Sequence, residues 1–129
     1  MRLVSFTLNN ESRFGIATDE GVIDLNQRTN LNSLSHALGD LPEIQAFEDV
    51  SPDHSWESLS FDIPIPDQRR LLCAGLNYHK KYPLGGEVKP PKQPVYFNKP
   101  PGCLVPHNGQ LIRPIASVQL DYEVELAVI

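Results

Sequence analysis

The chain contains little cysteine: only Cys73 and Cys103 occur among its 129 residues. They form neither a Cys-x-x-Cys pair nor a dense pattern, so nothing in their spacing indicates a disulfide framework. We therefore interpret both as reduced thiols, packed as small side chains, and expect a cytoplasmic protein.

Long apolar runs and an excess of basic charge are also missing. The N-terminus turns polar at Asn9 and Asn10 before a signal-peptide core forms, and no apolar run approaches a membrane span. The chain contains eleven Lys and Arg residues and sixteen Asp and Glu residues, which give a net charge of −5. Because a phosphate backbone requires a basic surface, nucleic acid is excluded as a partner, as is a membrane. A composition of 40% hydrophobic and 21% charged residues is typical of a globular protein.

The first half of the chain predicts an antiparallel meander followed by short helices. Two turn-rich clusters, around Asn9 and at 19–21, separate three segments of strand character, which are 2–8, 13–18 and 22–25. Helical spacing predicts helices over 32–38 and 43–50, the second opened by Pro42. Prolines keep residues 61–66 extended, so we place a domain boundary there and predict a small N-terminal domain over 1–66.

The second half, residues 67–129, is predicted to be rich in β-structure. Residues 70–74 are predicted to form a short, fully buried strand. The Pro-, Gly- and Lys-rich segment 80–94 is a long loop of the kind that often binds ligands. Further strands are predicted over 95–97, 110–113 and 120–129. The fold class is therefore α+β and β-rich.

The last ten residues carry the clearest chemical signal. Read as a strand, they place alternate apolar side chains on one face and Asp121, Glu123 and Glu125 on the other. Carboxylates crowded on one face repel one another, and a hard divalent cation is a common way to neutralise them. The alternative is an amphipathic strand whose polar face is solvated.

Three segments in this order resemble the fumarylacetoacetate hydrolase family: Gly-Leu-Asn-Tyr at 75–78, Pro-Val-Tyr-Phe-Asn-Lys-Pro at 94–100 and Leu-Asp-Tyr-Glu-Val-Glu-Leu-Ala-Val at 120–128. The N-terminal meander resembles the small first domain of that family. The resemblance runs through essentially all of this chain but only the first part of a family member. It implies that residues 67–129 are the truncated, incomplete start of a mixed β-roll catalytic domain, ending before the third metal carboxylate.

The resemblance implies an enzyme that uses Mg²⁺, or Mn²⁺ or Ca²⁺, on small oxo-acids. The expected reactions are C–C hydrolysis, decarboxylation or isomerisation of β-diketone or acylpyruvate-like substrates. Glu123 and Glu125 match the two metal-binding glutamates of the family, whereas the third carboxylate has no counterpart here. We therefore expect this chain to be inactive alone. The resemblance also allows a homodimer.

Other family positions match less closely. Members often place a His three residues after the Asn-Tyr pair and a Glu three further on, where this chain has Lys81 and Leu84. His79 is then the candidate catalytic residue, with a surface histidine as the alternative. Lys99 matches a family lysine and is predicted to bind substrate, or else to pair with a carboxylate. Tyr78 is predicted to bind substrate, with packing as the alternative.

Two other functional classes remain open from the sequence. One is a truncated, non-catalytic fragment, whose last strand would have an uncovered edge. The other is an anion-binding module built on the lysines of the second half. Those lysines are Lys80, Lys81, Lys89, Lys92 and Lys99.

Overall fold

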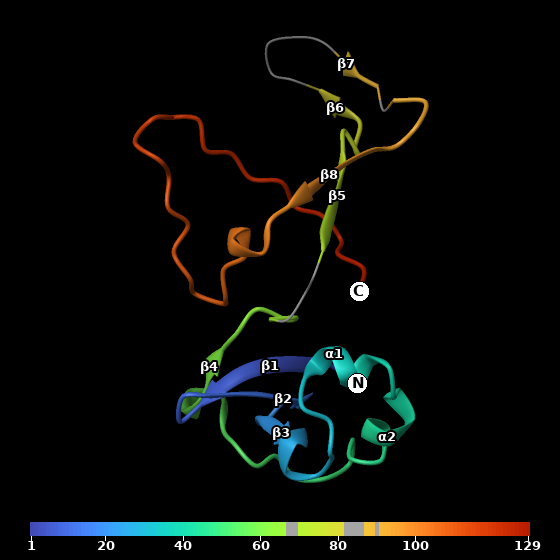
Figure 1. The fold of residues 1–129 in the computed structure, drawn as a ribbon, viewed down its shortest axis with the longest axis vertical. Helices are drawn as coiled ribbons and strands as arrows, with labels where there is room; N and C mark the ends of the chain where they lie inside the picture. The colour runs from blue at the N-terminus through green and yellow to red at the C-terminus, as the bar shows by residue number, and fades with distance from the viewer. Residues whose placement is uncertain (67–69, 82–86, 90) are drawn as a thin grey trace.

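The computed structural model describes residues 1–66, 70–81, 87–89 and 91–129. It is sheet-rich with few helices, which confirms the α+β, β-rich prediction at this coarse level (Figure 1). The helices among these residues are only a few residues long, far shorter than a bilayer crossing requires. The division into domains at residue 66 stays a prediction.

The predicted meander forms the N-terminal sheet. β1 (Leu3–Leu8), β2 (Glu11–Ala17) and β3 (Val22–Asp24) pair antiparallel, in the order β3-β2-β1-β4. Asn9 and Asn10 connect the first two strands with φ of 52° and 65°, a left-handed conformation that asparagine tolerates and that suits a tight hairpin. β4 (Ser60–Phe61) pairs with β1 in a region that the sequence predicted only as extended.

The outer edge of β3 is covered by a main-chain crossing. Val22 N donates to the His54 carbonyl oxygen at 2.9 Å, and Asp53 N donates to the Val22 carbonyl oxygen at 2.9 Å. The approach is so close that a Cβ on Gly21 would lie 2.1 Å from the His54 carbonyl oxygen. Only glycine therefore fits at position 21 without movement of the crossing segment.

Two short helices follow the sheet. α1 (Leu34–Leu38) begins at Ser33, whose hydroxyl accepts from His36 N, in the predicted region. α2 (Leu41–Gln45) ends before the predicted limit at residue 50. Beyond it, the amides of Phe47 and Glu48 bond to carbonyls three residues back, so tight turns replace the α-helix. The 3₁₀ segments are η1 (Leu25–Gln27), η2 (Trp56–Ser58) and η3 (Pro101–Cys103).

The hydrophobic core of the described residues lies in this N-terminal half. Side chains from β2 and β3 meet those of η1 and the two α-helices, and apolar burial of this kind is the main source of folding free energy. The cluster comprises Phe14, Ile16, Ile23, Leu25, Leu34, Ala37 and Ile44.

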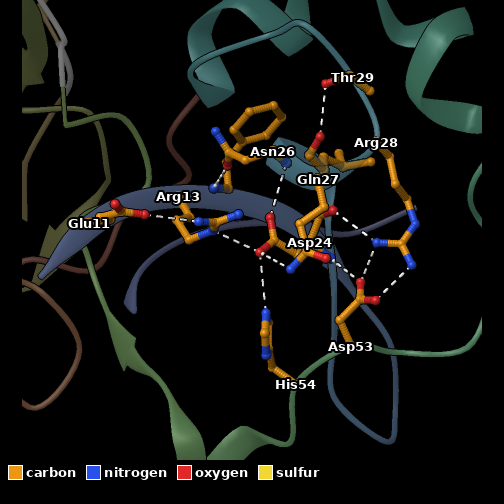
Figure 2. A network of polar contacts seen from close by, with 11 residues as sticks. Glu11, Arg13, Asp24, Asn26, Gln27, Arg28, Thr29, Asp53 and His54 are labelled. Atoms are coloured by element: carbon orange, nitrogen blue, oxygen red, sulfur yellow. Dashed lines mark hydrogen bonds and ion pairs between the residues drawn. The ribbon is translucent and has the colours of Figure 1, made fainter. Parts of the chain in front are cut away.

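A buried carboxylate organises the polar side of the same sheet (Figure 2). The Asp24 side chain is fully buried. Its Oδ2 accepts from Arg13 Nε at 2.7 Å and from Gln27 Nε2 at 3.0 Å, and His54 Nε2 lies 3.2 Å away. Its Oδ1 accepts from Asn26 N at 3.0 Å. Asp24 thus begins η1 and ties the strands to the segment at His54.

A second carboxylate extends this network. Asp53 pairs with Arg28 through two hydrogen bonds, one of them from Nη2 to Oδ1 at 2.7 Å, and accepts from Asp24 N at 2.8 Å. The hydrogen bond from Arg28 lowers the pKa of Asp53, and burial opposes this effect only in part. The carboxylate therefore stays ionised to lower pH than an ordinary aspartate.

The second half contains two short antiparallel pairs. β5 (Leu71–Gly75) pairs with β8 (Val95–Lys99), in agreement with the predicted strands, although β5 is not fully buried, since Leu72 is 62% exposed. β6 (Lys80–Lys81) pairs with β7 (Glu87–Val88) inside the segment predicted as a loop. β5 and β8 are not fully buried because no second layer among the described residues covers this two-stranded sheet.

Two strand predictions are wrong. Residues 110–113 and 120–129 are irregular, and the chain beyond β8 follows a wide arc that returns beside β5 (Figure 1). In the part of the chain that the structure describes, no strand pairs with either segment. An extended segment without a ladder partner gains no inter-strand hydrogen bonds to hold it. Cys73 and Cys103 are free, but Cys103 is exposed and not packed as predicted.

Candidate functional site

One cavity gathers two of the segments that the sequence singled out. It has a volume of about 440 Å³ and lies between the end of β5 and the chain near residue 123. The first wall is 74–78, the second is 122–125, and Phe97 of β8 completes the lining. These segments are far apart in the sequence, so the fold itself brings them together.

A strained turn shapes the first wall. β5 ends at Gly75, and Leu76 follows with φ of 55°, a left-handed conformation that is uncommon for a bulky residue. The turn carries Asn77 and Tyr78 to the cavity. Tyr78 is 48% exposed, so its ring lines the cavity and also contacts solvent. Unusual backbone of this kind often occurs at binding sites.

The second wall supplies the acidic groups. Glu123 and Glu125 both line the cavity, together with Tyr122 and Val124 between and beside them. Asp121 is not part of the lining, and its Oδ1 accepts from Tyr122 N at 2.8 Å. The structure therefore separates the two glutamates from the neighbouring aspartate, whose carboxylate bonds to the backbone of the next residue.

The cavity residues suit a hard cation in kind. Two carboxylates and the Asn77 amide provide oxygen donors, which Mg²⁺, Mn²⁺ and Ca²⁺ prefer. Within the described ranges, however, no three His, Cys, Asp or Glu side chains gather into a metal-binding group. The donors fit in type but are fewer than the six ligands that Mg²⁺ takes. The ligand role of Glu123 and Glu125 stays a prediction.

The other predicted site residues lie outside the cavity lining. His79 follows Tyr78 directly and is exposed. Lys99 is exposed on β8, two residues beyond Phe97, so alternation places both side chains on the same face of that strand. Of the two divergent family positions, Leu84 falls outside the described residues, and the side chain of Lys81 does too.

Among the lining residues that were not predicted as site residues, three have an amide or aromatic side chain: Asn77, Phe97 and Tyr122. Each lies inside a segment quoted for the resemblance, which was the available signal. The sequence-based prediction favoured titratable and cationic side chains. It therefore missed the Asn77 amide and the aromatic rings of Phe97 and Tyr122, which form part of the cavity walls.

Comparisons with known proteins identify relatives of this chain. The family described as Fumarylacetoacetate (FAA) hydrolase C-terminal matches residues 70–129, which include both walls of the cavity. An uncharacterized protein of Methanocaldococcus jannaschii is 33% identical over 110 residues, covering 84% of this chain and 35% of the relative. A mitochondrial oxaloacetate tautomerase of Homo sapiens is 33% identical over 76 residues, covering 57% of this chain and 23% of the relative.

A third relative, a fumarylacetoacetate hydrolase domain-containing protein 2 homolog of Dictyostelium discoideum, is 34% identical over 73 residues, covering 57% of this chain and 23% of the relative. The chain spans between 22% and 37% of the length of such curated relatives. No solved structure matches it significantly. The match of the family model to residues 70–129 and the relatives with this domain establish that this chain belongs, as a partial chain, to the fumarylacetoacetate hydrolase family.

Proposed function

We propose that the cavity between residues 74–78 and 122–125 is part of a divalent-cation site for a small oxo-acid. The observation that carries this proposal is that Glu123, Glu125 and Tyr78 line one cavity although distant segments provide them. Relatives named as oxaloacetate tautomerases support an oxo-acid as the substrate class and isomerisation as the reaction. C–C hydrolysis and decarboxylation are the other reactions that the resemblance allows.

Glu123 and Glu125 would hold the cation through their carboxylate oxygens, with the Asn77 amide oxygen beside them. When bound, Mg²⁺, Mn²⁺ or Ca²⁺ would supply Lewis acidity that favours an enolate over the ketone. Two carboxylates and one amide leave most of the coordination shell to water or substrate. We therefore propose that these 129 residues bind the cation weakly and are inactive by themselves.

The remaining residues would position the substrate and move its proton. Tyr78 would donate a hydrogen bond from its hydroxyl group to a substrate oxygen from the cavity wall, and Lys99 would attract a substrate carboxylate from the strand face that it shares with Phe97. The imidazole of His79 would accept the proton from the carbon next to the ketone and return it to the carbonyl oxygen, which completes an isomerisation. Its place directly after Tyr78 supports this role.

The wider architecture is part of the same proposal. Residues 67–129 would form the start of a mixed β-roll, and the protein would act in the cytoplasm as a homodimer. The lysine-rich anion-binding module stays a prediction from the sequence, and the side chains of Lys80 and Lys81 lie outside the described residues.

A titration with Mn²⁺ tests the cation site. We expect the full chain to bind Mn²⁺ with a dissociation constant of about 1 mM or weaker, as for a cation site with few protein ligands. Glu123→Gln and Glu125→Gln should each remove measurable binding, because each deletes one of two charged ligands. Asp121→Asn is the matched control, because Asp121 is adjacent in sequence but lies outside the cavity lining.

Two results would contradict the proposal. Mn²⁺ binding that survives both glutamine variants would place the cation elsewhere. A loss in Asp121→Asn equal to the loss in the glutamine variants would show that only general negative charge matters. For the substrate, chemical shift changes of Tyr78 on addition of oxaloacetate should weaken in Lys99→Ala.

A further inference from the structure

A separate cavity lies beside η2 and β4. It has a volume of about 530 Å³, which is within the range of small-molecule sites. One wall is formed by residues of η2 and β4, and the other by the turn at 106–109. This cavity shares no lining residue with the one between 74–78 and 122–125, so the proposed function does not use it.

Three aromatic rings line this cavity and contact one another in series. The ring centroids of Trp56 and Phe61 are 5.6 Å apart, and the two planes are tilted by 37°. The imidazole of His107 meets the Phe61 ring edge to face, with centroids 5.7 Å apart. The indole N–H of Trp56 donates to the Asp19 carbonyl oxygen at 3.4 Å, which holds the outer edge of the series. Trp56 and Phe61 are half-buried, so their rings are fixed by packing and still partly accessible.

A tight turn holds the opposite wall in place. Gly109 N donates to the Pro106 carbonyl oxygen at 2.9 Å, and Asn108 has φ of 60°. A left-handed third residue of this kind is typical of turns, and asparagine tolerates it. The turn therefore presents His107 to Phe61 through hydrogen bonding within four residues.

The charge of the lining favours a cation. Glu57 is exposed and is the lining's one carboxylate, and the lining residues include no Lys or Arg, all of them being within the described part of the chain. The faces of aromatic rings carry negative charge density and attract cations, with tryptophan the strongest. A carboxylate beside such rings adds to this attraction and repels anions.

We propose that this cavity binds the alkylammonium group of a small organic cation. A hard metal ion is the poorer occupant, because it requires six or more oxygen ligands, whereas Glu57 supplies the lining's only charged oxygens. An alkylammonium group is covered by methyl or methylene groups, which can pack on the rings and on Leu59 and Pro106. The structure thus assigns a binding site to the segment that joins the N-terminal sheet to β5.

A titration of the full chain with choline chloride tests the site. Trp56 is the only tryptophan, so its emission reports directly on the cavity. We expect a saturable change with half-saturation at about 10 mM or below, whereas sodium chloride at equal ionic strength should give none. The measurement is made without divalent metal, so failure of the metal site would not affect it. It is made at pH 8, where histidine is ordinarily neutral.

An uncharged probe of the same shape separates charge from apolar contact. In 3,3-dimethyl-1-butanol a carbon atom replaces the choline nitrogen, so the methyl groups remain and the charge is lost. This alcohol should bind at least about fivefold more weakly than choline, because it lacks the attraction to the ring faces and the carboxylate. Equal binding of the two probes would overturn the proposal, since an apolar hollow alone would then account for it.

A matched pair of variants locates the charge. Glu57→Gln should weaken choline binding at least about threefold, because it removes the carboxylate from the lining. Glu43→Gln is the control, since Glu43 is also an exposed glutamate in the N-terminal half but lies outside the lining. The proposal is also overturned if choline gives no saturable change, or if the two variants weaken binding equally.

Discussion

Replacement of Asp24 by alanine should destabilise the N-terminal half more than any other single change at a charged residue. The carboxylate is fully buried and holds donors from Arg13, Gln27 and Asn26. Removing one member of a buried ion pair typically costs about 3–5 kcal/mol. Arg13 keeps Glu11 as a partner at 3.1 Å, and its side chain is 19% exposed, so we expect the lower end, about 3 kcal/mol.

Urea unfolding at pH 7 measures this effect. Trp56 is the only tryptophan, and its ring lies 5.6 Å from that of Phe61, so its fluorescence reports on the N-terminal half. With a slope of about 1–3 kcal/mol per molar urea, the midpoint should fall by 1 M or more. Asp24→Asn, which keeps the shape but loses the charge, should cost about 2 kcal/mol and stay measurable if the alanine variant unfolds.

An exposed ion pair provides the control. Asp19 accepts from Arg2 Nη2 at 2.6 Å, but the two side chains are 96% and 65% exposed. Asp19→Ala should therefore change the free energy of unfolding by less than about 1 kcal/mol. If Asp24→Ala costs no more than Asp19→Ala, burial of the carboxylate does not stabilise the protein and the reasoning is refuted.

Further predictions concern acid stability and packing. Because Arg28 holds the pKa of Asp53 below its ordinary value, this carboxylate gives stability that is complete above the unfolded-state pKa of about 3.9 and is lost as pH falls through the lower folded-state pKa. Asp53→Asn should remove that part of the acid dependence when urea unfolding is compared at pH 6 and pH 3; an unchanged dependence contradicts the pairing. Ile44→Ala, at a fully buried position, should cost about 2–5 kcal/mol in the same assay. Gly15→Ala places a Cβ 2.2 Å from a backbone oxygen of β3 and should cost about 2 kcal/mol or more, whereas Gly102→Ala, with nothing within 4 Å, should be nearly neutral; equal effects would contradict this.

Local signals account for what the sequence predicted well. Asn9 and Asn10 make a tight turn between two alternating segments, and adjacent strands that share a short turn have few alternative partners. Ser33 and Gly39 likewise bound α1 through hydrogen bonds within a few residues. Structural features that depend on residues close in the chain can be predicted from a single sequence.

The errors come from features fixed at a distance. The alternation over 120–129 is real, but pattern determines only which side chains share a face, whereas a strand also needs a partner backbone. β4 was missed for the converse reason, because its two residues are a strand only through their pairing with β1. α2 ends early because turns bonded three residues back replace its last turn.

The candidate site shows the same division. Of the predicted site residues, Glu123, Glu125 and Tyr78 line the cavity, while His79 and Lys99 lie outside its lining, and the role of each stays a prediction. The sequence identifies residues with useful chemistry but does not show which side of a turn they occupy. At this site the left-handed backbone at Leu76 determines on which side of the turn the following residues lie. Neither composition nor hydrophobic periodicity predicts that conformation.

The crossing of residues 53 and 54 over β3 has a consequence for aggregation. Fibrils grow when strands add to bare sheet borders, and main-chain bonds to Val22 occupy this border. At the opposite border, β4 offers only two residues. Concentrated samples should thus polymerise through the second half of the chain. The N-terminal sheets should stay folded along the fibre, and their tryptophan emission should stay native.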